Sequence, residues 1–595
     1  MSLGPIPHGV TLEEGGARFR LWAPNADAVA LLYQGRSVDM AAAQEGWREA
    51  FVEGAKAGDT YQYQVGDLRV PDPASRGQKD DVHGPSLIVD PGAYEWRHTE
   101  WRGRPWEDTV IEEVHVGAAT PEGTFDGLRR KLSHYKELGV TAIEILPVAS
   151  FAGARNWGYD GVLQFAPDTS YGTPDDLRRL IDEAHGLGLQ MLIDVVYNHF
   201  GPDGNYLGAY AQDFFDQEKH TPWGAALNFG RAPVREFFIQ NAVMWLTEYR
   251  FDGIRFDAVQ AISGMAAAEG RGHFLEEMAE AIRERTKGRH VHLILENDDN
   301  TSELLVRKDG EAVFYDGQWN DDFHHVVHRM ITGETDGYYA DYPAPGERLA
   351  KVLREGFDYQ GQPSHHRGDK ARGTPSGGLP TTAFVNFIQN HDQVGNRALG
   401  DRIDEAAPEE AVVAATALYL LGPQIPMIWM GEEWASSSTF PFFCDFHGEL
   451  AEAVRNGRRE EFGRFEAFRD PAAREVIPDP NAQETFLAAK LDWQEMGRHR
   501  HADRIALFKE LLALRHEHVV PLLKSGGQGA EAENEGDTVL ARYRFGEGTL
   551  TICANLSPEG GGVHGDMPGE VIFSTHDALV PSAMPPWSLT ASIAR

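Results

Sequence analysis

The chain has 595 residues, of which 42% are hydrophobic and 25% charged, and a formal net charge of −36. This length predicts several domains, and the negative charge disfavours nucleic-acid and anionic membrane partners. No apolar run is long enough to cross a bilayer, and no signal peptide is evident. The two cysteines imply neither a disulfide framework nor a cysteine metal site. We therefore expect a cytoplasmic enzyme or binding protein.

The first hundred residues carry the pattern of short β-strands. Residues 17–24, 28–33 and 61–65 alternate partly between apolar and polar side chains, and turn-forming residues separate them. Short alternating segments with turn signals between them are typical of a β-sandwich. We therefore predict a small N-terminal β-sandwich over residues 1–100.

From Val110 onward, short apolar segments alternate with helical patterns such as Asp175–Leu187 and Arg235–Tyr249. Apolar strands separated by helices predict a parallel sheet covered on both faces. Eight of them within residues 101–500 favour an α/β fold, a closed (β/α)8 TIM barrel with loop insertions. The alternative is an open doubly wound sheet, but no Gly-x-Gly-x-x-Gly follows a strand. The eight expected strands are Val110–Val116, Ala142–Val148, Gln190–Tyr197, Gly253–Val259, His292–Glu296, Val313–Trp319, Ala383–Gln389 and Ile425–Met430.

The last hundred residues change pattern again. Asp503–His516 has helical spacing, and three later segments have strand character. We predict that residues 501–595 form a linking helix and a C-terminal all-β domain. The three segments are Thr538–Arg544, Leu550–Ala554 and Glu570–Ser574.

Two long insertions interrupt the predicted barrel. Gly201–Phe229 follows the third strand, and Tyr338–Leu379 precedes the seventh. The second insertion is rich in Gly, Pro, Arg and His, which is typical of loops. We expect it to be a surface excursion beside the mouth of the barrel.

Ionisable residues stand at the ends of four predicted strands. The third strand ends in Asp194–His199, the fourth in Arg255-Phe256-Asp257, the fifth in Glu296 and the seventh in His391-Asp392. The C-terminal ends of barrel strands meet at one face, where barrel enzymes carry their active sites. We therefore expect these groups to converge on one pocket.

Such a set suits the hydrolysis of a glycoside. A retaining glycosidase holds two carboxyl groups about 5 Å apart, one as nucleophile and one as acid and then base. The acid needs a raised pKa, whereas the nucleophile must stay ionised. Arg255 lies two residues before Asp257, so both side chains point to the same face of the strand and can form a charge-assisted bond.

Other interpretations of the same residues are open. A single Asp at a strand end is commonly a helix N-cap or a turn former, and an Arg-x-Asp pair is commonly structural. His199 and His391 could be metal ligands, but no His-x-His or His-Glu-x-x-His spacing supports a metal site. The Asp- and Asn-rich loops carry no specific calcium signature. We expect neither a metal nor a cofactor.

Four segments resemble the signature regions of the α-amylase superfamily, glycoside hydrolase family 13, in the order found there. The resemblance implies that Asp257 is the nucleophile, Glu296 the acid/base and Asp392 the transition-state stabiliser. It also implies that the N-terminal residues 19–24 belong to the sandwich that precedes the barrel in branching and debranching members. The four segments are Asp194–His199, Gly253–Val259, Leu295–Asn297 and Phe387–Asp392.

Further segments are similar to one group within that superfamily. Members of this group cut the α-1,4 bond next to the terminal trehalose of maltooligosyltrehalose, so that substrate and related α-glucans are the implied partners. Ala258-Val259-Gln260 follows the nucleophile where many amylases have a Lys-His pair, whereas the acidic run Asn297-Asp298-Asp299 departs from the family pattern. The similar segments are residues 121–125, 201–206, 221–224, 318–324, 390–397 and 430–434.

A trehalose site should offer an aromatic platform and several hydrogen-bonding groups, because buried polar groups discriminate most strongly between sugars. We suggest Trp223 as the platform, with polar groups from residues 320–322 and Gln393. The resemblance implies further contacts with the sugar at the cleavage point. The full set of predicted substrate contacts is Tyr159, Asp160, His199, Trp223, Arg255, Gln260, Asn320, Asp321, Asp322, His324, His391, Gln393 and Asn396.

Two competing functions are open. A glucan branching enzyme would share the sandwich and the catalytic residues and would differ only in the acceptor, a glucan hydroxyl instead of water. A catalytically inactive sugar-binding protein on the same barrel would have no need of Asp257, Glu296 and Asp392 together, so their joint presence argues against it.

Overall fold

A computed structural model describes residues 7–221, 224–262, 271–464 and 468–595. Its centre is a closed barrel of eight parallel strands that pair in chain order, with the last strand pairing with the first. The predicted TIM barrel is thereby confirmed, and each of the eight expected segments contains one strand. The strands are β10 Ile111–Val114, β11 Ala142–Ile145, β14 Gln190–Val195, β17 Gly253–Phe256, β18 His292–Leu295, β21 Gly317–Trp319, β24 Phe384–Asn386 and β25 Ile425–Trp429.

Helices cover the outside of the barrel. The expected helical segments correspond to α4 Pro174–Gly186 and α6 Ala232–Thr247. Thr173 begins α4 with a reciprocal capping box to Asp176, which satisfies backbone N–H groups that the first turn leaves free. Further helices are α7 Phe274–Arg285, α8 Asp321–Thr332, α9 Pro345–Glu355 and α12 Glu409–Leu421.

A separate apolar cluster fills the barrel. It includes Ile111, Ala142, Leu192 and Ile294, one from each of four strands, together with Trp319. Successive side chains of a strand alternate between its two faces. The residue two positions after each of these therefore faces the barrel axis as well, one layer nearer to the C-terminal mouth.

The N-terminal region folds into two antiparallel sheets, as predicted. One sheet has the order β1-β2-β6-β5, and the other β4-β3-β7-β8 with β9 pairing to β7. Phe19 and Tyr61 pack edge to face between the two sheets, with ring centroids 5.0 Å apart. The strands are β1 Gly9–Glu13, β2 Gly16–Trp22, β3 Val29–Tyr33, β4 Arg36–Asp39, β5 Ala41–Ala42, β6 Trp47–Glu53, β7 Thr60–Val65, β8 Leu68–Val70 and β9 Ser86–Leu87.

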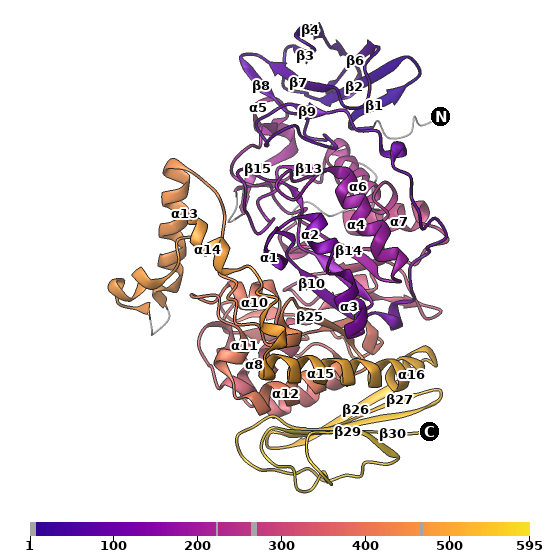
Figure 1. Ribbon diagram of the computed structural model, residues 1–595, viewed down its shortest axis with the longest axis vertical. Coiled ribbons are helices and arrows are strands. Elements are labelled where there is room, and N and C mark those ends of the chain that lie inside the picture. Colours follow the sequence, from indigo (N-terminus) through magenta and orange to yellow (C-terminus); the bar gives the residue numbers. More distant parts are fainter. Residues whose placement is uncertain (1–6, 222–223, 263–270, 465–467) are drawn as a thin grey trace.

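The C-terminal region begins with α15 His499–Leu514 and continues into a five-stranded antiparallel sheet. Three of the strands match expected segments. The sheet lies at the opposite end of the molecule from the sandwich (Figure 1), and the domain boundaries at residues 100 and 500 stay predictions. The strands are β26 Gly527–Glu535, β27 Thr538–Phe545, β28 Gly548–Asn555, β29 Glu570–Ser574 and β30 Ser588–Ala594.

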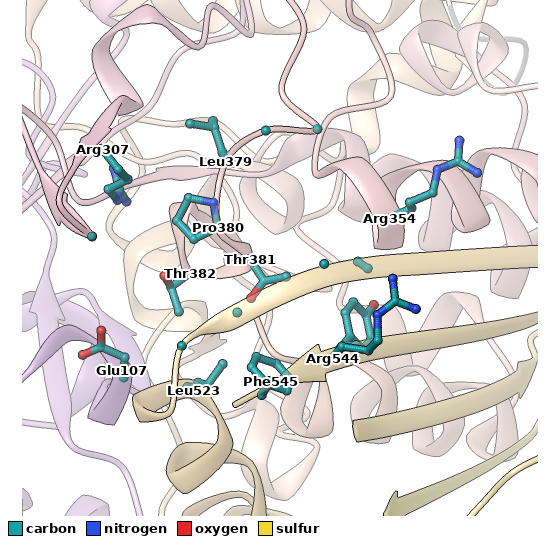
Figure 2. Close-up of a pocket in the computed structure, with 18 residues that line it drawn as sticks. Glu107, Arg307, Arg354, Leu379, Pro380, Thr381, Thr382, Leu523, Arg544 and Phe545 are labelled. Carbon is teal, nitrogen blue, oxygen red and sulfur yellow. The ribbon is translucent and has the colours of Figure 1, made fainter. Parts of the chain in front are cut away.

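A cavity of about 470 Å³ lies between this sheet and the barrel. Pro380 and Thr381 line it from the segment before β24, whereas Leu523 and Phe545 line it from α16 Val520–Lys524 and β27 (Figure 2). The described lining residues include no predicted site residue. Because the cavity adjoins the N-terminal end of β24, it lies away from the barrel mouth.

The two insertions differ in form. The first contains β15 Phe215–Thr221 paired with β16 Gly224–Leu227. The second, expected as a surface excursion, contains α9, whose inner face is buried, and an exposed hairpin of β22 Gln362–Ser364 and β23 Lys370–Arg372. The first two residues of each hairpin strand are exposed, as expected of a surface excursion. The inner face of α9 and the last residue of each hairpin strand, Ser364 and Arg372, are buried instead.

A further excursion carries α13 Gly448–Glu461 and α14 Gln483–Ala488 out to one side of the molecule (Figure 1). No helix in the described part of the chain is long and apolar enough to span a membrane.

Candidate active site

Charged side chains form the layer of the barrel that follows the apolar cluster toward the mouth. Glu113, Glu144, Asp194 and Glu296 each stand two residues after a member of that cluster. The first three are at most 2% exposed. Because side chains alternate along each strand, these four carboxylates face the barrel axis in the same layer and form a ring.

Arg255, on the strand between those of Asp194 and Glu296, contacts both of these carboxylates and is fully buried. Its Nη1 donates to Asp194 Oδ2 at 2.7 Å and to Asp257 Oδ1 at 2.8 Å, and its Nη2 lies 3.6 Å from Glu296 Oε2. The guanidinium also lies over the Trp319 ring, 4.0 Å from its centroid. One cation therefore holds three carboxylates in a fixed arrangement.

Asp257 accepts hydrogen bonds at both carboxylate oxygens. Oδ1 is bound by Arg255, and Oδ2 accepts from Asn198 Nδ2 at 2.8 Å. Donors aimed at both oxygens stabilise the negative charge and fix the orientation of the carboxylate. This arrangement suits a nucleophile.

Glu296 is placed differently. Its Oε2 accepts from the backbone N–H of Ala258 at 2.6 Å, and Ala258 has a left-handed backbone with φ 41°. Burial raises the pKa of Glu296 well above its usual range, and Asp257 adds to the rise, while Arg255 opposes it. A carboxyl group with a raised pKa, beside a carboxylate that accepts hydrogen bonds at both oxygens, suits a general acid.

Asp392 lies in the first turn of the short helix α10 His391–Gly395, which follows the seventh strand. Its Oδ2 lies 3.4 Å from His391 Nε2, and its Oδ1 accepts from Asn396 Nδ2 at 3.1 Å. The other ring nitrogen of His391 lies 2.6 Å from Glu113 Oε1. Burial lowers the pKa of His391, but Asp392 and Glu113 raise it more, to about 9. A protonated His391 therefore links the two carboxylates.

Tyr159 lies against this pair. Its ring stacks on His391 at 4.9 Å, and its hydroxyl donates to Asp194 Oδ2 at 2.6 Å. Gly158 before it has φ 107°, and a Cβ added there would lie 2.1 Å from the Pro147 carbonyl oxygen. Only glycine fits this close approach, so it fixes the entry of Tyr159 into the site.

Two more predicted contacts adjoin Tyr159. His199 Nε2 lies 3.0 Å from the Tyr159 carbonyl oxygen, and burial lowers the pKa of His199. Asp160 accepts from Asn156 Nδ2 at 2.7 Å, and burial raises its pKa. His199 Nδ1 also contacts Asn198 Oδ1, so both of its ring nitrogens have partners within the protein, and its contact with sugar stays a prediction.

Three residues at the start of α8 have protein partners instead of an open surface. Asn320 caps α8 by accepting from Phe323 N–H, and Asp322 is fully buried. His324 lies between the Ile388 carbonyl oxygen, at 2.8 Å, and the Tyr339 hydroxyl, at 3.2 Å. Asn320, Asp322 and His324 are thus buried and bonded within the protein, and their predicted contacts with sugar stay predictions.

Gln260, Asp321 and Gln393 are partly exposed. Asp321 is one of them, and burial, followed by Asp298, raises its pKa to about 7. Gln393 Oε1 accepts from the Tyr338 hydroxyl at 3.4 Å. Gln260 follows the nucleophile on a short 3-10 turn, Val259–Ala261. Trp223 lies outside the described residues, so its role as a platform stays a prediction.

Sequence reasoning missed Glu113, Glu144 and Asn198. The signal was present, because the first two strands continue the alternation that places Asp194 and Glu296 in the ring. Asn198 lies inside a recognised segment. Among the described residues, no group of three or more His, Cys, Asp or Glu is arranged to hold a metal ion.

Comparison with known families gives two matches. Residues 75–223 match the alpha amylase catalytic domain, and residues 2–91 match carbohydrate-binding module 48, the isoamylase N-terminal domain. The second match covers the β-sandwich, and the first covers the barrel from its first strand to beyond the third.

Relatives match over most of the chain. Malto-oligosyltrehalose trehalohydrolase from Deinococcus radiodurans is 40% identical, over 93% of this chain and 89% of its own length. The enzyme of that name from Saccharolobus solfataricus is also 40% identical, over 92% and 96%. A Salmonella typhimurium structure described as an alpha amylase has a TM-score of 0.94 and 44% identity, and the match covers 99% of both chains. This chain is therefore an α-amylase-type glycoside hydrolase and belongs to the malto-oligosyltrehalose trehalohydrolase family.

Proposed function

We propose that this hydrolase cuts the α-1,4 bond next to the terminal trehalose of maltooligosyltrehalose and releases trehalose, with Asp257, Glu296 and Asp392 as its catalytic residues. The observation that carries the proposal is the bonding of Arg255, which holds Asp257 and Glu296 on one guanidinium in contrasting environments. The names of the relatives support the choice of substrate.

The first step forms a covalent intermediate. An oxygen of Asp257 attacks the anomeric carbon while Glu296 gives its proton to the glycosidic oxygen, so that the bond to the leaving sugar breaks and trehalose departs. In the second step Glu296 takes a proton from water, and the resulting hydroxide oxygen replaces Asp257 at the same carbon. Two inversions retain the α configuration.

Asp392 acts on the charge that develops between these states. The sugar becomes oxocarbenium-like, and a carboxylate that bonds to its hydroxyls binds it more tightly than the ground state. His391 and Asn396 orient Asp392 from two sides. Asp392 and Glu113 together raise the pKa of His391 to about 9, against the effect of burial.

The substrate class is an α-glucan. The carbohydrate-binding module supports this class, and so does the fold shared with an Anoxybacillus pullulanase complexed with maltotriose, with a TM-score of 0.72 at 18% identity. On the leaving side we propose Asp321 and Gln393 as hydrogen-bonding groups for trehalose, with Trp223 as the platform. The cytoplasmic location stays a prediction.

Product analysis on maltooligosyltrehalose tests the function. We expect free trehalose, together with a maltooligosaccharide released in the α configuration, and no new α-1,6 linkages. Replacing Glu296 by Gln should lower the rate by about 10³-fold or more, because the leaving oxygen then receives no proton. New α-1,6 branches would show a branching enzyme instead, and an undiminished rate in Glu296→Gln would refute the mechanism.

A further inference from the structure

The second insertion, residues 338–379, contacts the segment that follows Glu296 through Arg367, Arg372 and two backbone N–H groups, and Arg372 is the buried one of the two arginines. Arg372 ends β23 and is 5% exposed. Its Nε donates to the Asp298 carbonyl oxygen at 2.7 Å, and its Nη2 lies 3.0 Å from Asp298 Oδ1. Its Nη1 donates to Asp322 Oδ1 at 2.9 Å and to the Tyr342 hydroxyl at 2.8 Å. Nε and Nη1 therefore have hydrogen-bond partners, while Nη2 lies within ion-pair distance of Asp298 without a hydrogen bond.

Arg372 bridges two segments of the chain, and the first is the segment that follows Glu296. Asp298 is two residues after Glu296, and the chain there is also bound by backbone hydrogen bonds from the insertion. Gly373 N–H donates to the Asp299 carbonyl oxygen at 2.9 Å, and Thr374 N–H donates to the Asn300 carbonyl oxygen at 3.1 Å. The acidic run, unexplained by the family pattern, is thus the surface that receives the insertion.

The other end of the bridge holds the start of α8. Besides Arg372, Asp322 accepts from the Tyr342 hydroxyl at 2.6 Å and from the backbone N–H groups of Asp358 and Tyr359 at 2.7 and 2.9 Å. Asp322 follows Asp321, which contributes to the electrostatic environment of Glu296. Arg372 therefore fixes the separation between the acid's segment and a neighbouring wall of the site.

We propose that Arg372 is a positioning residue for proton donation by Glu296, acting through Asp298 and Asp322 without touching the substrate. This proposal rests on the proposed function, because it requires Glu296 to be the general acid. A shift of about 1 Å in a catalytic group can cost a hundredfold in rate. Lysine keeps the charge but cannot reproduce the forked contacts, so Arg372→Lys should move the segment of Glu296.

The test compares two substrates that need the acid to different degrees. Trehalose leaves maltooligosyltrehalose as an alcohol and must be protonated, whereas fluoride leaves α-maltotriosyl fluoride as an anion without a proton. We expect Arg372→Lys to lower kcat/KM on maltooligosyltrehalose about tenfold or more, and on the fluoride less than about threefold. The ratio of the two rates does not depend on how much of a preparation has folded.

Two variants calibrate this test. Glu296→Gln should show the same selective loss in a larger form, and Lys370→Gln, an exposed position on the same strand, should leave both rates unchanged. Equal losses on both substrates in Arg372→Lys, or no loss on either, would overturn the inference while leaving the proposed function intact. If Glu296→Gln itself shows no selective loss, the proposed function fails first.

Discussion

Two groups of buried or partly buried carboxylates belong to different parts of the same barrel wall, one around β14 to β18 and the other around β10 and β25. The mouth cluster, Asp194, Asp257 and Glu296, surrounds Arg255 inside the barrel. The outer cluster consists of Glu112, Glu432 and Glu433, which are all fully buried. Glu112 precedes Glu113, so strand alternation sends these two neighbours to opposite faces of β10.

Both clusters contain carboxyl groups whose pKa is raised by burial, but the clusters differ in their exposure to solvent and substrate. Burial and then Glu433 raise the pKa of Glu112 well above its usual range, and burial raises that of Glu432 to about 8. Glu432 accepts from Tyr419, and Glu433 lies 3.1 Å from His134 Nε2, so protein groups occupy the outer cluster. Glu296 and Asp257 keep 14% and 13% of their side chains exposed. A shifted pKa therefore indicates burial, and only an opening to substrate makes the group catalytic.

The sharpest way to separate the clusters is to remove the nucleophile. Asp257→Asn should lower activity on both maltooligosyltrehalose and α-maltotriosyl fluoride by about 10⁴-fold or more, since no covalent intermediate can form. Thermal unfolding should change little in comparison. Retained activity on the fluoride alone would show that another group attacks the anomeric carbon.

A smaller loss of activity is expected on replacing Glu113, which lies on β10 where this strand pairs with β25 and closes the barrel. Glu113→Gln removes a carboxylate that raises the pKa of His391, so we expect that pKa to fall below about 9. Activity should drop roughly tenfold to a hundredfold, and the loss at alkaline pH should begin at a lower pH than in the parent. A pH–rate profile of both proteins measures this shift. An unchanged alkaline limb would mean that His391 has no part in the reaction.

Replacing Glu112, the neighbour of Glu113 on the outer face of β10, should change the stability of the protein but not its activity. The folded protein binds the Glu112 proton more tightly than the unfolded chain, whose pKa is near 4.5. Stability therefore falls as pH rises from 4.5 through the raised folded value. Glu112→Gln should flatten this slope and raise the free energy of unfolding by about 1 kcal/mol at pH 8, with kcat unchanged. Denaturant unfolding at pH 5 and pH 8 checks it, and a lower kcat would contradict the division between the clusters.

Much of this site could be predicted from the sequence because strands alternate and barrels place strand ends together. Those two rules bring Arg255, Asp257 and Glu296 to one point. They do not distinguish a sugar ligand from a helix cap, and Asn320 is such a cap. The strands β26 and β30 were missed because the first has few apolar residues and the second mainly small ones. The contacts of Arg372 with Asp298 and Asp322 could not be predicted, because they depend on the path of an insertion that has no periodic sequence pattern.

The contact between Glu113 and His391 joins residues that are 278 positions apart. Contacts of such sequence separation require a large loop to close, so we expect them to form after local helices. A chain in which β10 has not yet met β24 and β25 therefore has no oriented Asp392. Recovery of activity after dilution from denaturant reports the closing of the barrel, whereas recovery of helix content reports earlier events.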